Sequence, residues 1–133
     1  MKPFDYAKHW IAVLSLEASV KNAARLFRDE NIGSILVKDE DGAPVGLLTD
    51  KVLFNAIAEG VDLRDKKVAD LKVENLVYIE KDADIEDVAE NFPKSPSGRL
   101  AMTDKNGNIV GILKRKNIER FSAFRVAKSI VRK

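Results

Sequence analysis

Short apolar runs flank a polar cluster near residue 40, and this pattern predicts a β-hairpin. Residues 35–37 and 45–48 are too short for helices, and the Asp, Glu, Gly and Pro residues between them are typical of a turn. The whole segment Gly33–Lys51 recurs as Gly98–Lys116, at a constant offset of 65 residues and with seven of nineteen positions identical. Because the turn glycines stay in register, the pattern indicates an internal duplication.

The segments before each hairpin repeat as well. Residues 3–9 and 68–74 predict a short helical turn, and residues 10–14 and 76–79 are apolar runs of strand length. Behind these runs, Ser19 and Asp84 occupy helix N-cap positions, and apolar residues follow at helical spacing. We expect each helix to pack this face on its own hairpin. The packing positions are Val20, Ala23, Ala24 and Phe27 in the first copy and Ile85, Val88, Ala89 and Phe92 in the second.

A second helix is expected after each hairpin. The first begins near Asp50 and ends at Gly60, and the second begins near Asn117. The expected buried face of the first consists of Val52, Leu53, Ala56 and Ile57. With residues 61–67 as a linker, each repeat is strand, helix, strand, strand, helix. We assign the two repeats to residues 1–66 and 67–133.

Length and composition restrict the class of protein. A chain of 133 residues has the length of one domain, so neither repeat would bury much core alone and we expect the two to pack together. The absence of cysteine excludes disulfides and thiolate metal sites. No apolar run approaches the length of a membrane span, and the N-terminus lacks the apolar core of a signal peptide. We therefore expect a soluble, cytoplasmic protein with no membrane partner.

The net charge of +2 conceals a basic C-terminus. Residues 114–133 contain eight Lys or Arg residues and one acid, whereas the remaining chain has fifteen basic and twenty acidic residues. This tail suggests a second class of function, nucleic-acid binding through phosphate contacts. Phe121 and Phe124 suit the packed face of the helix, so exposed aromatics are not interleaved with the charges and this interpretation is disfavoured. The basic positions in question are Arg120, Arg125, Lys128 and Arg132.

The sequence contains no pattern that predicts a catalytic or metal-binding cluster. His9 is the only histidine, so a structural or exposed role is favoured over metal binding. Residues 39–42 are similar to the start of a calcium loop, but the later ligands are missing and residues 104–107 suit a hairpin turn equally well. No Ser, Thr or Lys lies in a pattern that supplies a general base and an oxyanion donor. We predict neither an enzyme nor a metal or cofactor site.

The order of elements resembles the CBS domain, named for cystathionine β-synthase. The first hairpin starts with Asn-Ile-Gly-Ser and ends with Val-Gly-Leu-Leu-Thr, and the likeness covers nearly the whole chain twice. The resemblance implies an α+β fold, a tandem pair of β-α-β-β-α domains related by pseudo-two-fold symmetry, which often dimerises into a disc. Such pairs commonly bind AMP, ATP or S-adenosylmethionine in clefts between the two sheets and thereby regulate another protein. We expect any such effect here to pass to a separate effector protein.

The resemblance also implies a ligand motif, Gly-x-x-Thr/Ser-x-x-Asp, at the end of each hairpin. The first copy keeps the hydroxyl of Thr49 but has Val52 in place of the ribose carboxylate, and Asp50 lies two positions early, where it is as well placed to cap the helix. The second copy has Lys114 in place of the hydroxyl and Asn117 in place of the carboxylate. Because Asn accepts a hydroxyl hydrogen bond and Lys offers a charge for phosphate, the second cleft is preferred.

The start of each hairpin and the preceding strand match the part of the family site that holds adenine. Arg99 could reach phosphate or stack on a base, whereas Gly33 and Gly98 are explained equally well by turn geometry. The residues assigned to the preferred second cleft are Tyr78, Ser97, Gly98, Arg99, Lys114 and Asn117. The residues assigned to the weaker first cleft are Val13, Ile32, Gly33, Ser34, Thr49 and Asp50.

These observations predict a stand-alone regulatory CBS pair that binds an adenine nucleotide, AMP, ADP or ATP. One site per chain should dominate, and a phosphate-bearing nucleotide should bind better than S-adenosylmethionine, whose sulfonium the cationic side chains repel. The apolar faces of the helices that follow each hairpin predict a homodimer. A ligand-free dimeric scaffold is the main alternative, because both ligand motifs are incomplete, and a nucleic-acid-binding protein is the weaker one.

Overall fold

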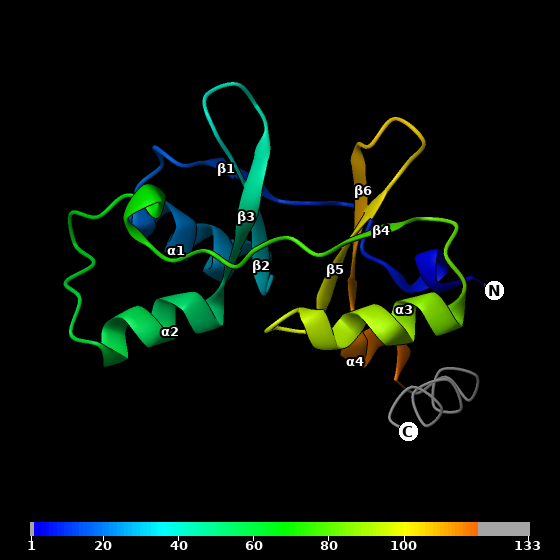
Figure 1. Cartoon of the computed structure of the whole chain (residues 1–133). Helices are drawn as coiled ribbons and strands as arrows, with labels where there is room; N and C mark the ends of the chain where they lie inside the picture. The colour runs from blue at the N-terminus through cyan, green and yellow to red at the C-terminus, as the bar shows by residue number, and fades with distance from the viewer. Residues whose placement is uncertain (1, 120–133) are drawn as a thin grey trace. The chain divides into compact units, whose positions relative to one another are not determined.

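The computed structural model describes residues 2–119 and divides into two compact units. Ala12–Asn75 form one, which we call the first-repeat unit, and the described parts of Met1–Ile11 and Leu76–Lys133 form the other, the second-repeat unit. Figure 1 shows that each has a small sheet with helices beside it. Each unit is described by itself below.

The first-repeat unit contains a three-stranded sheet in the order β1-β2-β3. Strand β1 runs parallel to β2, and β3 pairs antiparallel to β2 with Ser34 opposite Thr49. Its elements are β1 (Val13–Ser15), α1 (Val20–Glu30), β2 (Ser34–Lys38), β3 (Pro44–Thr49), α2 (Asp50–Ala58) and the 3-10 helix η2 (Val68–Asp70).

The second-repeat unit has the same topology, with the sheet order β4-β5-β6. Strand β4 runs parallel to β5, and β6 pairs antiparallel to β5 with Arg99 opposite Lys114. Its described elements are η1 (Pro3–Tyr6), β4 (Tyr78–Glu80), α3 (Ile85–Asn91), η3 (Phe92–Lys94), β5 (Arg99–Thr103), β6 (Ile109–Lys114) and α4 (Arg115–Ile118). The predicted order of strand, helix, strand, strand, helix is confirmed in both repeats.

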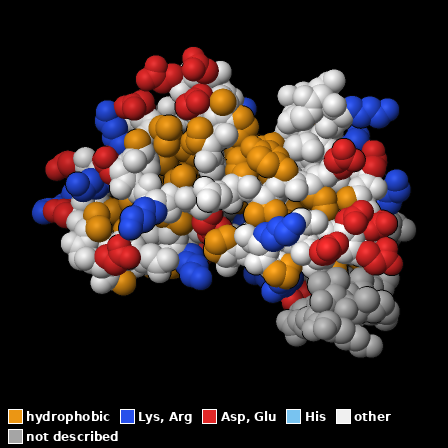
Figure 2. Space-filling view, viewed as in Figure 1, with side chains coloured by type: hydrophobic (Ala, Val, Ile, Leu, Met, Phe, Trp, Pro, Cys, Tyr) orange, Lys and Arg blue, Asp and Glu red, His pale blue; other side chains and the backbone are white. Residues whose placement is uncertain are grey.

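Both hairpin turns are closed by an aspartate. The Asp39 carboxylate accepts hydrogen bonds from the amides of Asp41 and Ala43, both at 2.9 Å. Asp104 repeats this arrangement, and the glycine of each turn has a left-handed backbone, with φ +80° at Gly42 and +82° at Gly107. Figure 2 shows acidic side chains over the tip of the β2–β3 hairpin, in agreement with a solvated turn.

The predicted N-caps of α1 and α3 are confirmed. The Ser19 hydroxyl accepts from the amide of Asn22, and the Asp84 carboxylate accepts from that of Asp87, both at 3.0 Å. The predicted boundaries of the last helix were less accurate, because α4 begins at Arg115 with Lys114 as its N-cap residue rather than near Asn117.

Two packing predictions were wrong. The strands begin at Val13 and Tyr78, three and two residues later than expected, because the earlier residues make only one sheet hydrogen bond each, from the carbonyls of Ala12 and Val77. Ala24 is exposed, and Ile57 is 58% exposed although it was expected to be buried. Helix α2 therefore carries an apolar face that the first-repeat unit does not cover.

Each unit has its own core, built from one face of its sheet and the helices packed on it. The core of the first-repeat unit consists of Ala12, Ala23, Ile35, Val37, Leu48, Val52 and Val68. The core of the second-repeat unit consists of Ile79, Val88, Ala89, Phe92, Leu100, Met102, Leu113 and Ile118. The second core is the better filled, since it centres on the completely buried ring of Phe92.

The segments that precede the repeats are exchanged between the units. Phe4, Tyr6 and Ala7 pack against the core of the second-repeat unit, and Lys8 pairs with Ile112 through two main-chain hydrogen bonds of 2.9 and 3.0 Å. In the same way, Glu74 pairs with Leu47 through bonds of 2.8 and 2.9 Å. The compact units are thus cut after Ile11 and Asn75, whereas the division after residue 66 follows the sequence repeat and stays a proposal.

Most of the basic tail lies outside the described residues. Of its cationic positions, the structure places Lys114, Arg115 and Lys116, and the predicted helix positions from residue 120 onward are not among those described. Within residues 2–119, no helix combines the length and the hydropathy that crossing a bilayer requires.

Candidate functional site

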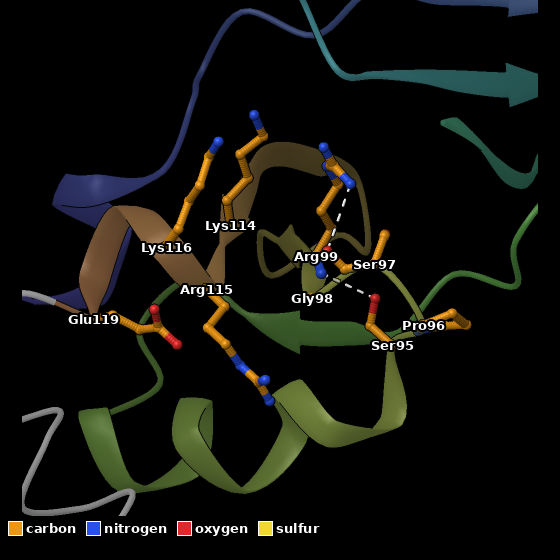
Figure 3. A pocket seen from close by; sticks show the side chains of 9 residues that line it. All are labelled: Ser95, Pro96, Ser97, Gly98, Arg99, Lys114, Arg115, Lys116 and Glu119. Atoms are coloured by element: carbon orange, nitrogen blue, oxygen red, sulfur yellow. Dashed lines mark hydrogen bonds between the residues drawn. The ribbon is translucent and has the colours of Figure 1, made fainter. Parts of the chain in front are cut away.

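A pocket in the second-repeat unit lies where β5 begins and β6 passes into α4 (Figure 3). Its volume is about 400 Å³, within the usual range for small-molecule sites. The lining residues are Ser95, Pro96, Ser97, Gly98, Arg99, Lys114, Arg115, Lys116 and Glu119. Four of them are cationic and one is acidic, so the pocket suits an anionic ligand.

Main-chain hydrogen bonds hold the wall of this pocket in place. Pro93 and Pro96 end the regular helix after α3, and the chain turns at Ser95, whose carbonyl accepts from the amide of Gly98 at 3.2 Å. Gly98 has φ +66°, so the turn interpretation of this glycine is favoured over ligand approach. The Gly98 carbonyl in turn accepts from the amide of Arg115 at 2.8 Å, which ties the start of β5 to the start of α4.

Ser95 adds a side-chain bond to this framework. Its buried hydroxyl accepts from the amide of Arg99 at 2.9 Å, shown as a dashed line in Figure 3. The amides at this corner are therefore used within the protein. Recognition of an anion in the pocket falls to the cationic side chains rather than to a nest of free backbone donors.

The cationic side chains divide into two groups. Figure 3 shows Arg99, Lys114 and Lys116 pointing to one side of the pocket, whereas Arg115 points the other way, toward α3. The Arg115 guanidinium lies over the ring of Phe92, with its Cζ 5.8 Å from the ring centroid, a cation–π contact. The Nε atoms of Arg99 and Arg115 are buried and have no hydrogen-bond partner among the described residues. Buried donors of this kind are rare in proteins without a role.

The pocket brings together four of the six residues predicted for the second site. Ser97, Gly98, Arg99 and Lys114 line it, but Tyr78 and Asn117 do not. Tyr78 lies on β4 opposite Ala101 and is 49% exposed, and Asn117 is exposed on α4. The role of all six residues in ligand binding stays a prediction.

Sequence reasoning missed five lining residues, Ser95, Pro96, Arg115, Lys116 and Glu119. Lys114, Arg115 and Lys116 are consecutive, and the two unassigned residues were counted only as part of the basic tail. Their position directly after a predicted strand was the available signal, because the end of a strand is where a hairpin delivers side chains to a site. Ser95 carried no signal, since its contribution is a hydroxyl bond to a neighbouring amide.

The residues predicted for the first site are arranged differently. Thr49 is completely buried, and its hydroxyl donates to the Glu74 carboxylate at 2.7 Å and accepts from the amide of Val52 at 3.4 Å as the N-cap of α2. Asp50 is the first residue of that helix and accepts from the amide of Lys51 at 2.8 Å. The hydroxyl that the family motif would offer to a ligand is thus engaged within the protein.

The other residues of this first site surround the start of the hairpin. Ile32, Gly33 and Ser34 are half-buried where β2 begins, and Val13 is 45% exposed on β1 opposite Leu36. Gly33 is not among the glycines with positive φ, so its conformation does not itself require glycine. Ligand binding at this first site stays a prediction.

His9 takes part in a local packing arrangement. Its ring stacks on Phe4 with centroids 4.3 Å apart, and its Nε2 lies 3.0 Å from the Phe4 carbonyl oxygen. Among the side chains of residues 2–119, no group of three or more His, Asp and Glu is placed to hold a metal ion.

A second, apolar groove lies in the first-repeat unit. It has a volume of about 710 Å³ and runs between α1 and α2. Phe54 and Ile57 on α2 are 66% and 58% exposed, which is unusual for side chains of this size. The lining residues are Val20, Lys21, Ala24, Phe27, Asp50, Leu53, Phe54, Ile57, Leu63, Arg64 and Asp65.

Comparisons with known proteins agree with this architecture. The family model described as CBS domain matches residues 11–59 and 68–123. An uncharacterised protein of Methanocaldococcus jannaschii is 34% identical over 100 residues, which make up 75% of this chain and 32% of that protein. The chain thus spans about a third of the length of this curated relative.

Two solved structures share the fold over nearly the whole chain. A CBS domain protein of Pyrobaculum aerophilum complexed with AMP has a TM-score of 0.79 at 16% identity, covering 98% of this chain and 99% of that one. The protein CBSX2 of Arabidopsis thaliana in complex with AMP has a TM-score of 0.65 at 24% identity, covering 94% and 97%. At these identities the likeness shows the fold alone. The resemblance and the tandem α+β fold that the sequence predicted are confirmed.

Proposed function

The chain belongs to the CBS domain family, and from this premise we propose that it binds an adenosine-containing nucleotide, AMP, ADP or ATP, in the pocket of the second-repeat unit. CBS-pair proteins are typically regulatory rather than catalytic. We therefore infer that nucleotide binding changes the interaction of this chain with a separate effector protein. A cytoplasmic location is part of this proposal.

One observation carries the proposal. Arg99 and Lys114 face each other across the β5–β6 ladder at the mouth of a pocket of about 400 Å³. Both lie at positions predicted for the ligand from the sequence, and two neighbouring cations with a buried, unpartnered Nε favour a phosphate. The AMP complexes of the two structural relatives support an adenine nucleotide as the carrier of that phosphate.

A thermal-shift and calorimetric screen tests the proposal. The full chain is measured with AMP, ADP, ATP and S-adenosylmethionine at fixed ionic strength. We expect the phosphate-bearing nucleotides to raise the melting temperature, by a stabilisation of about 2.7 kcal/mol at one hundred times the dissociation constant. S-adenosylmethionine should bind more weakly, because the pocket is cationic.

Two variants make this screen specific. Arg99→Ala should weaken nucleotide binding at least tenfold, by about 1.5 kcal/mol or more for a lost charge-assisted bond. Lys105→Ala, at the exposed tip of the β5–β6 hairpin, removes the same charge far from the pocket and should have no effect. If no nucleotide shifts the melting temperature at millimolar concentration, the proposal fails and the ligand-free scaffold becomes the better interpretation.

We also propose that the chain forms a homodimer through α2. The exposed Phe54 and Ile57 beside an apolar groove support a second copy of the same chain as the partner. Phe54→Asp should abolish a dimer in analytical ultracentrifugation, whereas Asn55→Asp, which adds the same charge at the next position, should leave it intact. A wild-type chain that stays monomeric at tens of micromolar would exclude this proposal.

A further inference from the structure

The internal duplication provides a comparison within one molecule. Four cationic pocket positions of the second repeat correspond to four positions of the first at the same offset of 65 residues. The second repeat has Arg99, Lys114, Arg115 and Lys116 where the first has Ser34, Thr49, Asp50 and Lys51. The two backbones share strand order and register, so the repeats differ at this corner mainly in charge, which is four units positive in the second and zero in the first.

This charge difference is costly for the fold. Arg99 and Lys114 are direct cross-strand partners, and like charges at directly opposed positions destabilise an antiparallel pair. Ser34 and Thr49 occupy the same ladder position in the first repeat without any repulsion. Stability therefore does not explain the cationic pair, whereas a bound anion that offsets both charges does.

A third cation extends the pair into a row. Lys116 is exposed on α4, and its side chain points to the same side of the pocket as those of Arg99 and Lys114 (Figure 3). The three side chains come from β5, β6 and α4 respectively, so their charges are distributed along the pocket rather than gathered at one point. A single phosphate group carries a charge of about −2 and matches two of these cations, whereas linked phosphates offer separate oxygens to all three.

We propose that the pocket is specific for a nucleoside polyphosphate, with Arg99, Lys114 and Lys116 binding successive phosphates. This proposal rests on the proposed function and adds that the phosphate chain, rather than the nucleoside, determines the preference. It assigns Lys116 as a specificity-determining residue. The first repeat lacks this row, and the hydroxyl of Thr49 is hydrogen-bonded to the carboxylate of Glu74, which adds negative charge where an anion would have to bind.

Isothermal titration calorimetry of the full chain with AMP, ATP and inorganic tripolyphosphate tests the assignment. Divalent cations are left out, because they would neutralise the phosphates, and ionic strength is kept constant. We expect ATP to bind about tenfold or more tightly than AMP, with one site per chain. Lys116→Ala should lower the affinity for ATP about tenfold and that for AMP less than about twofold.

Lys51→Ala is the matched control, since Lys51 is the equivalent exposed lysine of the first repeat. It should change neither affinity, and thermal melting of both variants checks that they are folded. Equal affinities for AMP and ATP would overturn the polyphosphate proposal while leaving nucleotide binding intact. Binding of none of the three compounds would overturn both. Tripolyphosphate that binds as tightly as ATP would support the phosphate row and refute recognition of the nucleoside.

Discussion

Alanine substitution at two equivalent glycines should have very different effects on stability. Gly46 on β3 and Gly111 on β6 occupy the same position in the two repeats, and each lies beneath the exchanged segment that pairs with its strand. At Gly46 an added Cβ would lie 2.6 Å from Val73 Cγ2 and 2.7 Å from the Glu74 carbonyl oxygen. At Gly111 the nearest atom is Phe4 Cε1, at 3.1 Å.

The nature of the obstructing atoms determines the magnitude. The Glu74 carbonyl accepts from the Leu47 amide at 2.9 Å, so it can move away from a Cβ at Gly46 only by breaking the main-chain pair. Overpacking typically costs about 1–3 kcal/mol and each lost hydrogen bond about 0.5–1.5 kcal/mol, so Gly46→Ala should cost about 3 kcal/mol. The ring of Phe4 is half-buried and can shift by a few tenths of an ångström, so Gly111→Ala should cost about 1 kcal/mol.

Urea unfolding of the two variants measures this difference. Far-UV circular dichroism follows both units, and fluorescence of Trp10, the only tryptophan, follows the second-repeat unit. Hydrogen exchange provides a local check, because Gly46→Ala should accelerate exchange at the Leu47 amide while that of Ile112 stays protected. Equal losses of stability in the two variants, or a larger loss in Gly111→Ala, would refute the argument from the exchanged segments.

Two other substitutions probe single polar groups. Thr49→Val removes a buried hydroxyl that bonds a carboxylate and caps α2, and it should destabilise the protein by about 2–3 kcal/mol in urea unfolding. Thr103→Val, which removes one 3.4 Å bond from a half-buried hydroxyl, should cost less than about 1 kcal/mol. The amide of Asn108, with a smaller contribution from a second turn amide, holds the pKa of Asp104 below its ordinary value of 3.8. This stabilisation is present above that ordinary value and is lost as the pH falls through the lowered pKa, so Asp104→Asn should be less stable than wild type at pH 7 and equal to it in strong acid, as thermal melts across pH would show.

Much of the fold follows from local patterns. The turn aspartates and glycines, the helix caps and the short apolar runs each determine structure within a few residues, and the duplication doubled every signal. The exchange of segments could not be predicted in this way, because residues 3–9 and 68–74 carry the same local pattern whichever sheet they join. Ile57 was placed in the core for a similar reason, since helical spacing gives the direction of a face but not whether anything covers it.

The site was predictable where it coincides with the hairpin. Arg99 and Lys114 were found because both lie at ends of predicted strands, and antiparallel pairing brings such ends together. Arg115 and Lys116 were missed because a run of charges in one sequence gives no sign of which members face a pocket. That Thr49 is bonded to Glu74 could not be predicted either, since the two residues lie on different elements and meet only through the tertiary fold.

The exchanged segments also determine the order in which the chain can fold during synthesis. The first-repeat unit is contiguous, from Ala12 to Asn75, and all its partners are available as soon as Asn75 has left the ribosome. The second-repeat unit needs Lys8 to pair with Ile112, so its N-terminal segment stays without its sheet until most of the chain has been made. The unit that contains the cationic pocket is therefore completed last, and the nascent chain becomes competent to bind a nucleotide there only near the end of translation.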